Sequence, residues 1–386
     1  MWKILLGALV LNMPFLNAQE AQVVKLSPPT INSETVLEEI VCVRPFREGE
    51  CNISLEHKGP KTIVHCYGHG PSGWTLLFGS VDRAIDLYAK SNPDKKKPIR
   101  VIGGGCMGLT TAIELHRRGY KVAAIYTKSL YDNPSWRAGA FFSVTQYAEE
   151  SAYLNDLNIQ TFLAYKSIKA GKHPYVSKEA VRMLPVYCNT GSKVGLEYLE
   201  EKGYIPPRKY VTLDFGKGVI HPNYVEFMSY YIDTYEVMRQ LIGELQRIRI
   251  PIVLKYVKNF DELNEEIIFN CSGLGSKDLN NDEQVKAMRG HIITLKPIAK
   301  ARHMDYMICT MVEQDGQEEC IYLFPKTMSV TPKFQLGTPC QGVLGGTFLP
   351  DVEKLPLSEQ RTLDRKEFKK LLDRNCQFFH GHPFER

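Results

Sequence analysis

The residues best suited to chemistry begin with the run Gly103-Gly104-Gly105-Cys106-Met107-Gly108, which has the spacing G-x-G-x-x-G. Residues 99–102 before it form a strand-like stretch, and residues 109–118 after it carry apolar side chains at helical spacing. A second strand-like stretch follows at 121–126. This order of strand, glycine turn, helix and strand predicts a dinucleotide-binding unit, and the alternative is a glycine-rich structural turn.

Three glycines of the run have separate roles in such a unit. Gly103 permits the tight turn, Gly105 lets the backbone approach a pyrophosphate, and Gly108 lets the helix pack close to the strand. The helix N-terminus, with the amides of Cys106 and Met107, faces the phosphates. These five residues are therefore predicted to bind the cofactor.

One residue departs from the usual pattern at the end of the second strand. An acid ordinarily stands there and binds the ribose hydroxyls, but this chain has Thr127 and Lys128. A lysine could suit a 2′-phosphate instead. An NADP-dependent or quinone-linked dehydrogenase therefore remains an alternative at this point.

A second glycine-containing loop lies nearer the N-terminus. Residues 62–66 are strand-like, residues 67–75 break that pattern with glycine and proline, and residues 76–88 have helical spacing. The polar, proline-punctuated stretch 91–98 then reads as a linker. Near the C-terminus, residues 357–379 form an amphipathic helical pattern.

Composition excludes several classes of function. The 386 residues carry 48 basic and 43 acidic side chains, a mild net charge of +5 with no long basic tract, so nucleic-acid binding is not indicated. The ten cysteines include no CxxC pair, so no structural metal site is expected. Charged residues make up 24% and hydrophobic residues 44%, which is usual for a soluble globular protein of one or two domains.

The first 18 residues have the pattern of a secretory signal. Lys3 precedes an apolar run over residues 4–16, and the small Ala18 follows. An attached hydrophobic strand or helix is the alternative. We expect an exported, periplasmic or secreted protein if the signal operates and a cytoplasmic one otherwise, with no integral membrane segment.

Several short motifs together resemble the FAD-dependent D-amino-acid oxidases and the wider glycine-oxidase group. After the glycine run they follow the family's order along residues 99–380. The matching segments are Ala138-Gly139, Asn270-Cys271-Ser272-Gly273, Arg289-Gly290-His291-Ile292 (where the family has Arg-Gly-Gln-Ile), Tyr322-Leu323-Phe324-Pro325 and Leu344-Gly345-Gly346-Thr347-Phe348.

Two further family motifs stand before the glycine run instead of after it. Val43-Arg44-Pro45-Phe46-Arg47 resembles the Arg-Pro-x-Arg motif, and Cys66-Tyr67-Gly68-His69-Gly70 resembles the Tyr-Gly-His-Gly loop. A circular permutation accounts for this order, because neighbouring chain ends can be rejoined without disturbing a compact domain. The alternative is an unrelated N-terminal module.

The permuted organisation divides the chain into four parts. Residues 1–18 are the signal, 19–90 the family's C-terminal part, 91–98 the linker, and 99–386 the remaining FAD-binding unit with an interleaved substrate domain. The expected fold class is α/β, with a Rossmann-like FAD half and an antiparallel-sheet substrate half.

The resemblance implies a substrate site that needs no side-chain base. Arg44 matches the arginine that holds the substrate carboxylate in a two-bond fork, and Tyr322 matches a tyrosine that adds a bond to the same group. The backbone carbonyl of Pro71 matches the acceptor for the amine. We expect His69 to be structural or flavin-contacting, because hydride transfer from a neutral amine needs no general base.

The resemblance also implies contacts to FAD beyond the glycine run. A helix that begins after the 67–75 loop would place its positive end at the flavin's pyrimidine ring. The implied contacts are His69, Gly70, Gly73, Trp74, Thr75, Lys128, Ala138, Gly139 and Ser272.

The implied activity is oxidation of a D-amino acid, with hydride transfer to flavin and reoxidation by O2 to give peroxide, a keto acid and ammonia. Glycine oxidase or another amine oxidase or dehydrogenase of this fold is an alternative, as is a flavin-fold protein without turnover. The partners are a small amino acid and O2, and an oligomer is possible.

Three positions that shape substrate choice depart from the mammalian enzymes. Glu318 falls where a lid tyrosine stands, Phe142 where they have glutamine, and Ala140 where they have leucine. An acidic lid would disfavour acidic substrates through like-charge repulsion.

Overall fold

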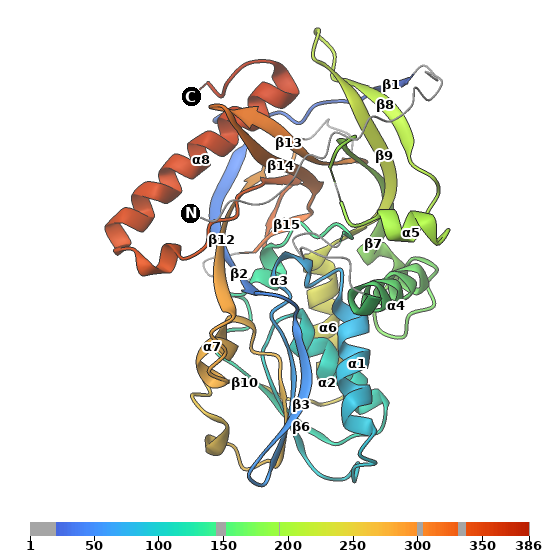
Figure 1. Ribbon diagram of the computed structural model, residues 1–386, viewed down its shortest axis with the longest axis vertical. Helices are drawn as coiled ribbons and strands as arrows, with labels where there is room; N and C mark the ends of the chain where they lie inside the picture. The colour runs from blue at the N-terminus through green and yellow to red at the C-terminus, as the bar shows by residue number, and fades with distance from the viewer. Residues whose placement is uncertain (1–20, 144–151, 193, 299–303, 331–336, 386) are drawn as a thin grey trace.

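Two large β-sheets with helices packed on them, and a small two-stranded sheet, make up the described part of the fold (Figure 1). The computed structural model describes residues 21–143, 152–192, 194–298, 304–330 and 337–385. The predicted signal, residues 1–18, lies outside the described residues. Within the described part, we find no helix with the length and apolar character that crossing a membrane requires.

The first sheet has six strands in the order β10-β6-β5-β11-β4-β3, and all its pairings are parallel except that between β3 and β4. Every residue of β5 and β11 is buried, as expected for apolar strands covered on both faces. The strands are β3 (Asn52–Lys58), β4 (Lys61–Tyr67), β5 (Ile99–Ile102), β6 (Val122–Thr127), β10 (Ile252–Leu254) and β11 (Ile267–Asn270).

Helices α1 (Leu77–Ala89), α2 (Cys106–Arg117) and α6 (Thr234–Arg247) pack beside one another in this half, α1 against α2 and α2 against α6. Apolar side chains of α1 and α2, such as Ile85 and Ile113, are fully buried in the main core. Gly119 then ends the α2 turn with a φ of +84°, a conformation that favours glycine. This is the predicted Rossmann-like half.

The second sheet has nine strands in the order β1-β8-β9-β7-β13-β14-β17-β12-β2. The sequence analysis predicted an antiparallel sheet in this half. The sheet is mixed instead, because β1 pairs with β8 and β13 with β7 in parallel. The strands are β1 (Gln22–Lys25), β2 (Val36–Arg47), β7 (Val181–Asn189), β8 (Lys209–Asp214), β9 (Ile220–Ile232), β12 (Val285–Leu295), β13 (Met307–Gln314), β14 (Gln317–Pro325) and β17 (Gly342–Gly345).

Helix α8 (Leu357–His380) covers one face of the second sheet, and Figure 1 shows it along the side of that half. Phe368 and Leu371 of α8 form a separate core with Ile293, Leu323 and Leu344 of the sheet. The remaining elements are α3 (Pro134–Arg137), α4 (Ala152–Lys169), α5 (Glu197–Glu201), α7 (Ser276–Leu279), β15 (Met328–Ser329) and β16 (Thr338–Pro339).

The N-terminal segment is built into both sheets. Strand β4 lies between β11 and β3, and β2 pairs along its length with β12. The 91–98 stretch runs beside β6, where the amide of Lys121 donates to the carbonyl of Lys95 at 3.0 Å. Pro29 also contacts the C-terminal helix, since His380 Nε2 of α8 lies 2.9 Å from the carbonyl oxygen of Pro29.

Candidate functional site

The glycine run forms a cradle that excludes side chains. Gly103 has a φ of +124°, and a Cβ there would lie 2.2 Å from the carbonyl oxygen of Cys271. A Cβ on Gly108 would lie 2.0 Å from the carbonyl oxygen of Gly103. Both glycines are therefore required by backbone contact, as the spacing predicted.

Helix α2 begins at this cradle, and its N-cap residue provides no side-chain cap. Gly105 is its N-cap, with no side-chain cap and no acidic residue in the first turn. The amide of Cys106 donates to Ser135 Oγ at 3.0 Å, and Met107 is buried beside it. First-turn amides that have no partner within the helix suit an anion such as a pyrophosphate, so the residues fit the phosphates of FAD.

The turn after β11 packs against Gly103 of the glycine run. The amide of Cys271 donates to the carbonyl of Ile102 at 2.8 Å, and Ser272 Oγ donates to Asn270 Oδ1 at 2.7 Å. Ser272 therefore lies beside Gly103. Lys128 is exposed just after β6, next to Thr127, whose side chain packs against Gly104, and its ammonium lies 5.9 Å from the ring centre of Tyr256.

A buried lysine, which the sequence analysis missed, holds the Ala138–Gly139 segment. Lys326 Nζ donates at 3.0 Å to three oxygens: the carbonyls of Trp136 and Ala138 and the Thr234 hydroxyl. Burial lowers the pKa of Lys326, yet three acceptors match the three hydrogens of an ammonium group. No local pattern signals this role, because its acceptors are backbone carbonyls far away in sequence.

The 67–75 loop returns to the strand that carries Arg44. Phe46 and His69 form an isolated β-bridge, and Gly70 has a φ of +54° with its α-carbon against the Phe46 ring. Pro71 lies next, within a short 3₁₀ turn (Gly70–Ser72) that Gly73 ends. The loop and Arg44 are thereby held in one region.

His69 is buried and bonded to a serine. Its Nε2 lies 3.0 Å from Ser80 Oγ, and burial lowers its pKa to about 3. A neutral imidazole bonded to a buried serine fits the predicted structural or flavin-contacting role.

Trp74 and Thr75 follow, just before α1. Thr75 Oγ1 donates to the carbonyl of Ser143 at 2.9 Å, and the Trp74 carbonyl accepts from the Tyr165 hydroxyl at 2.8 Å. The Trp74 indole N–H is buried without a hydrogen-bond partner in the described chain. A buried donor of this kind ordinarily has a partner, so this end of the loop fits a bound group with acceptor atoms.

Arg44 lies on β2, and its guanidinium packs against the backbone of neighbouring segments. It is 9% exposed, its Nη1 donates to the carbonyl of Thr347 at 3.1 Å, and its Cζ lies 4.6 Å from the ring centre of Phe348. A Cβ on Gly290 would lie 2.2 Å from Nη1. No acidic side chain among the described residues forms an ion pair with Arg44, so its charge is left for a ligand.

Tyr322 lies next to Arg44. Its ring stacks on Phe324 with centroids 4.6 Å apart, and its hydroxyl passes over Gly345, where a Cβ would lie 2.1 Å away. Burial raises the pKa of Tyr322, while Arg44 acts to lower it. The phenol is therefore neutral and can donate to a carboxylate beside the guanidinium.

Gly139 lies close to Phe324, the residue whose ring stacks on Tyr322, because a Cβ on Gly139 would lie 2.6 Å from Phe324.

The three positions expected to shape substrate choice lie in different surroundings. Glu318 is exposed in β14 opposite Glu313, within a hairpin strand and not in a lid loop. Phe142 packs against Phe162 with centroids 5.5 Å apart, and Ala140 is buried.

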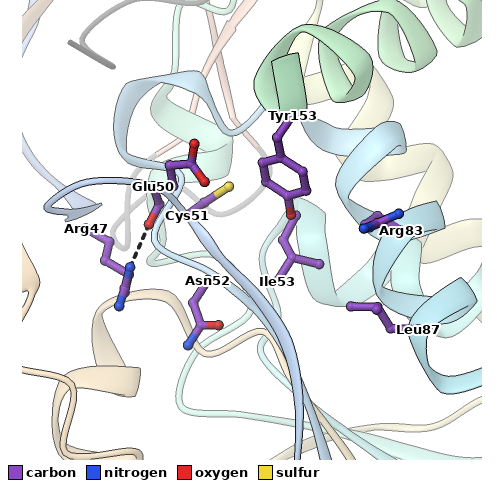
Figure 2. A pocket seen from close by; sticks show the side chains of 8 residues that line it. All are labelled: Arg47, Glu50, Cys51, Asn52, Ile53, Arg83, Leu87 and Tyr153. Atoms are coloured by element: carbon purple, nitrogen blue, oxygen red, sulfur yellow. Dashed lines mark hydrogen bonds between the residues drawn. The ribbon is translucent and has the colours of Figure 1, made fainter. Parts of the chain in front are cut away.

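A hollow of about 290 Å³ lies outside this arrangement (Figure 2). Arg47 and Arg83 line it together with Tyr153 of α4, and Arg47 Nη1 donates to the carbonyl of Glu50 at 2.9 Å. None of the predicted site residues lines this hollow. Among the described residues there is also no cluster of His, Cys, Asp or Glu that could hold a metal ion.

Comparison with protein families shows the family to which the chain belongs. Residues 99–385 match the model of the FAD-dependent oxidoreductase (DAO) family, so the chain belongs to that family and uses FAD. A D-amino-acid oxidase from Dictyostelium discoideum is 24% identical over 210 residues, which is 53% of this chain and 59% of that protein. A D-amino acid oxidase from Dugesia ryukyuensis is 40% identical over 65 residues, 16% of this chain and 18% of that protein.

The matched part of the chain thus spans less than two thirds of these relatives' length. Among solved structures, fructosamine oxidase (Amadoriase II) from Aspergillus fumigatus aligns with a TM-score of 0.43 at 16% identity, over 66% of this chain and 64% of that one. Iminodiacetate oxidase from Chelativorans sp. BNC1 aligns with a TM-score of 0.43 at 10% identity, over 71% and 78%.

Proposed function

We propose that this FAD-dependent oxidoreductase oxidises the CH–NH2 group of a D-amino acid. The observation that carries the proposal is the pair formed by Arg44 and Tyr322, a buried cation that has no acidic partner among the described residues, beside a neutral phenol. A planar guanidinium and a hydroxyl side by side are suited to one carboxylate. The similarity to two D-amino-acid oxidases supports the same substrate class.

In this proposal the chain supplies binding and orientation. Arg44 and Tyr322 hold the carboxylate, and the carbonyl of Pro71 accepts from the amine. The chemistry that FAD would supply when bound is that of a hydride acceptor that O2 can reoxidise, with hydrogen peroxide as the product. The substrate loses a hydride and a proton to become an imino acid, which water hydrolyses to a keto acid and ammonia.

We also propose that the family's motifs are circularly permuted in this chain. Three observations support this: the family match begins at residue 99, strands β2 and β4 pair with the later strands β12 and β11, and Pro29 contacts His380. The segment 19–90 would then be the family's C-terminal part, which provides Arg44 and the 67–75 loop.

A peroxide assay of the purified, FAD-loaded protein across D-amino acids, L-amino acids, glycine and simple amines tests the activity. We expect turnover with D-amino acids and little with their L-enantiomers. Arg44→Ala should lower kcat/KM by about a hundredfold through loss of a charge-assisted fork. Tyr322→Phe should cost about tenfold or less, because it removes one bond.

Arg239→Ala is the matched control, since Arg239 is exposed on α6 and pairs only locally with Glu236. It should behave like the parent protein. Equal turnover by Arg44→Ala and the parent on a D-amino acid would refute the site, and turnover only with amines lacking a carboxylate would refute the substrate class.

A further inference from the structure

A chain of hydrogen bonds runs from Arg44 through the sheet to helix α8. Arg44 Nη1 donates to the carbonyl of Thr347, and Thr347 Oγ1 lies 2.9 Å from His291 Nδ1. On the other side of the ring, His291 Nε2 lies 2.9 Å from Asp364 Oδ1 on α8. Asp364 is also held by Arg289, whose Nε and Nη2 donate to its two oxygens at 2.8 and 2.6 Å.

The partners fix which atoms donate. The Asp364 carboxylate can only accept, so His291 carries its hydrogen on Nε2, and its Nδ1 accepts from the Thr347 hydroxyl. The same hydroxyl oxygen accepts from the backbone amide of His291 at 2.6 Å. Thr347 is therefore bonded at its hydroxyl in two directions, and the peptide that it shares with Phe348 presents its carbonyl to Arg44.

Burial makes this arrangement rigid. His291 is 0% exposed and Thr347 is 3% exposed, and the ring of Phe368 packs edge-on against the imidazole at 4.9 Å. Asp364, Glu367 and Arg289 are the charged groups that face the imidazole, and burial outweighs the two acids to lower its pKa. The neutral ring agrees with the donor pattern above. His291 stands where the resembled family has glutamine, so the network belongs to this chain.

We propose that Asp364, His291 and Thr347 act as positioning residues that aim Arg44 at the substrate carboxylate. This inference rests on the proposed function, because it assigns a purpose to the carboxylate fork. None of the three touches substrate. They hold in place the Thr347 carbonyl to which Arg44 Nη1 donates, and this contact limits how the guanidinium can rotate. Loss of the network should weaken binding of the substrate carboxylate, which raises KM, more than it lowers kcat for the bound substrate.

Thr347→Val is the sharpest test, since it removes the hydroxyl at nearly constant volume and keeps the carbonyl that Arg44 uses. We expect KM for the D-amino acid to rise about tenfold with kcat changed far less, the pattern for lost uniform binding. Calorimetry with the corresponding keto acid, which binds without turnover, should show the same tenfold rise in Kd. Thr347→Ser restores the hydroxyl and should return both constants to near the parent values.

Phe368→Leu is the matched control, because it disturbs packing against His291 and removes no hydrogen bond. Unchanged KM and Kd in Thr347→Val, or an equal rise in Phe368→Leu, would overturn the inference. If Thr347→Val does not fold, Asp364→Asn decides: a rise in Kd of about threefold or more supports the network, and a parent-like Kd refutes it. A parent protein that neither binds the keto acid nor oxidises D-amino acids would instead refute the proposed function.

Discussion

The guanidinium of Arg44 lies against the backbone of Gly290, on the strand that pairs with its own. In the register of β2 and β12, Arg44 is opposite Met288 and Gly290 is opposite Cys42, so the side chain crosses its partner strand diagonally. A Cβ on Gly290 would contact three atoms of the guanidinium, the nearest at 2.2 Å. The glycine thus makes room for the arginine.

Gly290→Ala should therefore displace Arg44 without unfolding the protein, since Gly290 does not have a positive φ and only a side-chain end must move. We expect kcat/KM for a D-amino acid to fall by about tenfold to a hundredfold, approaching Arg44→Ala, with FAD content unchanged. Gly243→Ala, where a new Cβ meets nothing within 4 Å, is the control. Parent-like kinetics in Gly290→Ala would show that Arg44 is free to bind substrate from another position.

Gly105→Ala should weaken FAD binding. The new Cβ would lie 3.0 Å from Ser135 Oγ, which can rotate away, so the fold should survive while the backbone loses its close approach to the pyrophosphate. We expect the Kd for FAD, measured by quenching of flavin fluorescence, to rise by about tenfold or more, or ~1.4 kcal/mol. An unchanged Kd would place the pyrophosphate elsewhere.

His69 should make the protein sensitive to acid. Its pKa is about 3 in the fold and near 6.5 in the unfolded chain, so between these values the unfolded state binds the extra proton. The free energy of unfolding should fall by about 1.4 kcal/mol per pH unit from this residue as pH drops from 6.5 toward 3. Urea unfolding at pH 7, 6 and 5 measures the slope.

His69→Gln keeps an amide near Ser80 and cannot titrate. The pH dependence of its free energy of unfolding should therefore be less steep, by up to the contribution of one proton. It should also keep most of the oxidase activity, because no base is required. A slope equal to that of the parent would mean that His69 is solvated in the folded protein.

Restoring the ordinary order of the motifs should preserve the protein. A chain that begins at Pro98, runs to Arg386 and continues through a short flexible linker into residues 36–90 should fold and bind FAD, because Pro29 and His380 are already in contact. Deleting residues 21–90 should abolish FAD binding, since β11 and β12 each lose a paired strand. FAD titration of both chains decides, and tight binding by the deleted chain would identify the N-terminal segment as a separate module.

Local patterns predicted helices and strands well where the residues of one continuous segment determine the element. The strand at 99–102 and the helix at 357–379 are confirmed to within a residue, as β5 and α8. The helix predicted from residue 109 begins at Cys106, because the last residues of a glycine run look like loop although they form the first helical turn.

Contacts between distant segments could not be predicted. Arg44 and Thr347 are 303 residues apart, and neither local sequence signals the other. The buried Lys326, the bond between His291 and Asp364, and the parallel pairing of β13 with β7 also depend on the finished fold. The resemblance named Arg44 and Tyr322 as candidate site residues, but it gave no indication of the hydrogen-bond network behind Arg44.

The placement of β2 and β4 at the start of the chain has a consequence for synthesis. Both strands leave the ribosome early, yet their partners β12 and β11 lie within residues 267–295. At about 5–20 residues per second, the nascent chain waits roughly 10–50 s before either pairing can form. During that interval β2 and the edge of β4 that later pairs with β11 stay unpaired, because only β3 is available to β4, and aggregation can begin on such edges. Co-translational folding of this protein should therefore depend on chaperones that cover an N-terminal segment, and not only on the late closure of the sheets.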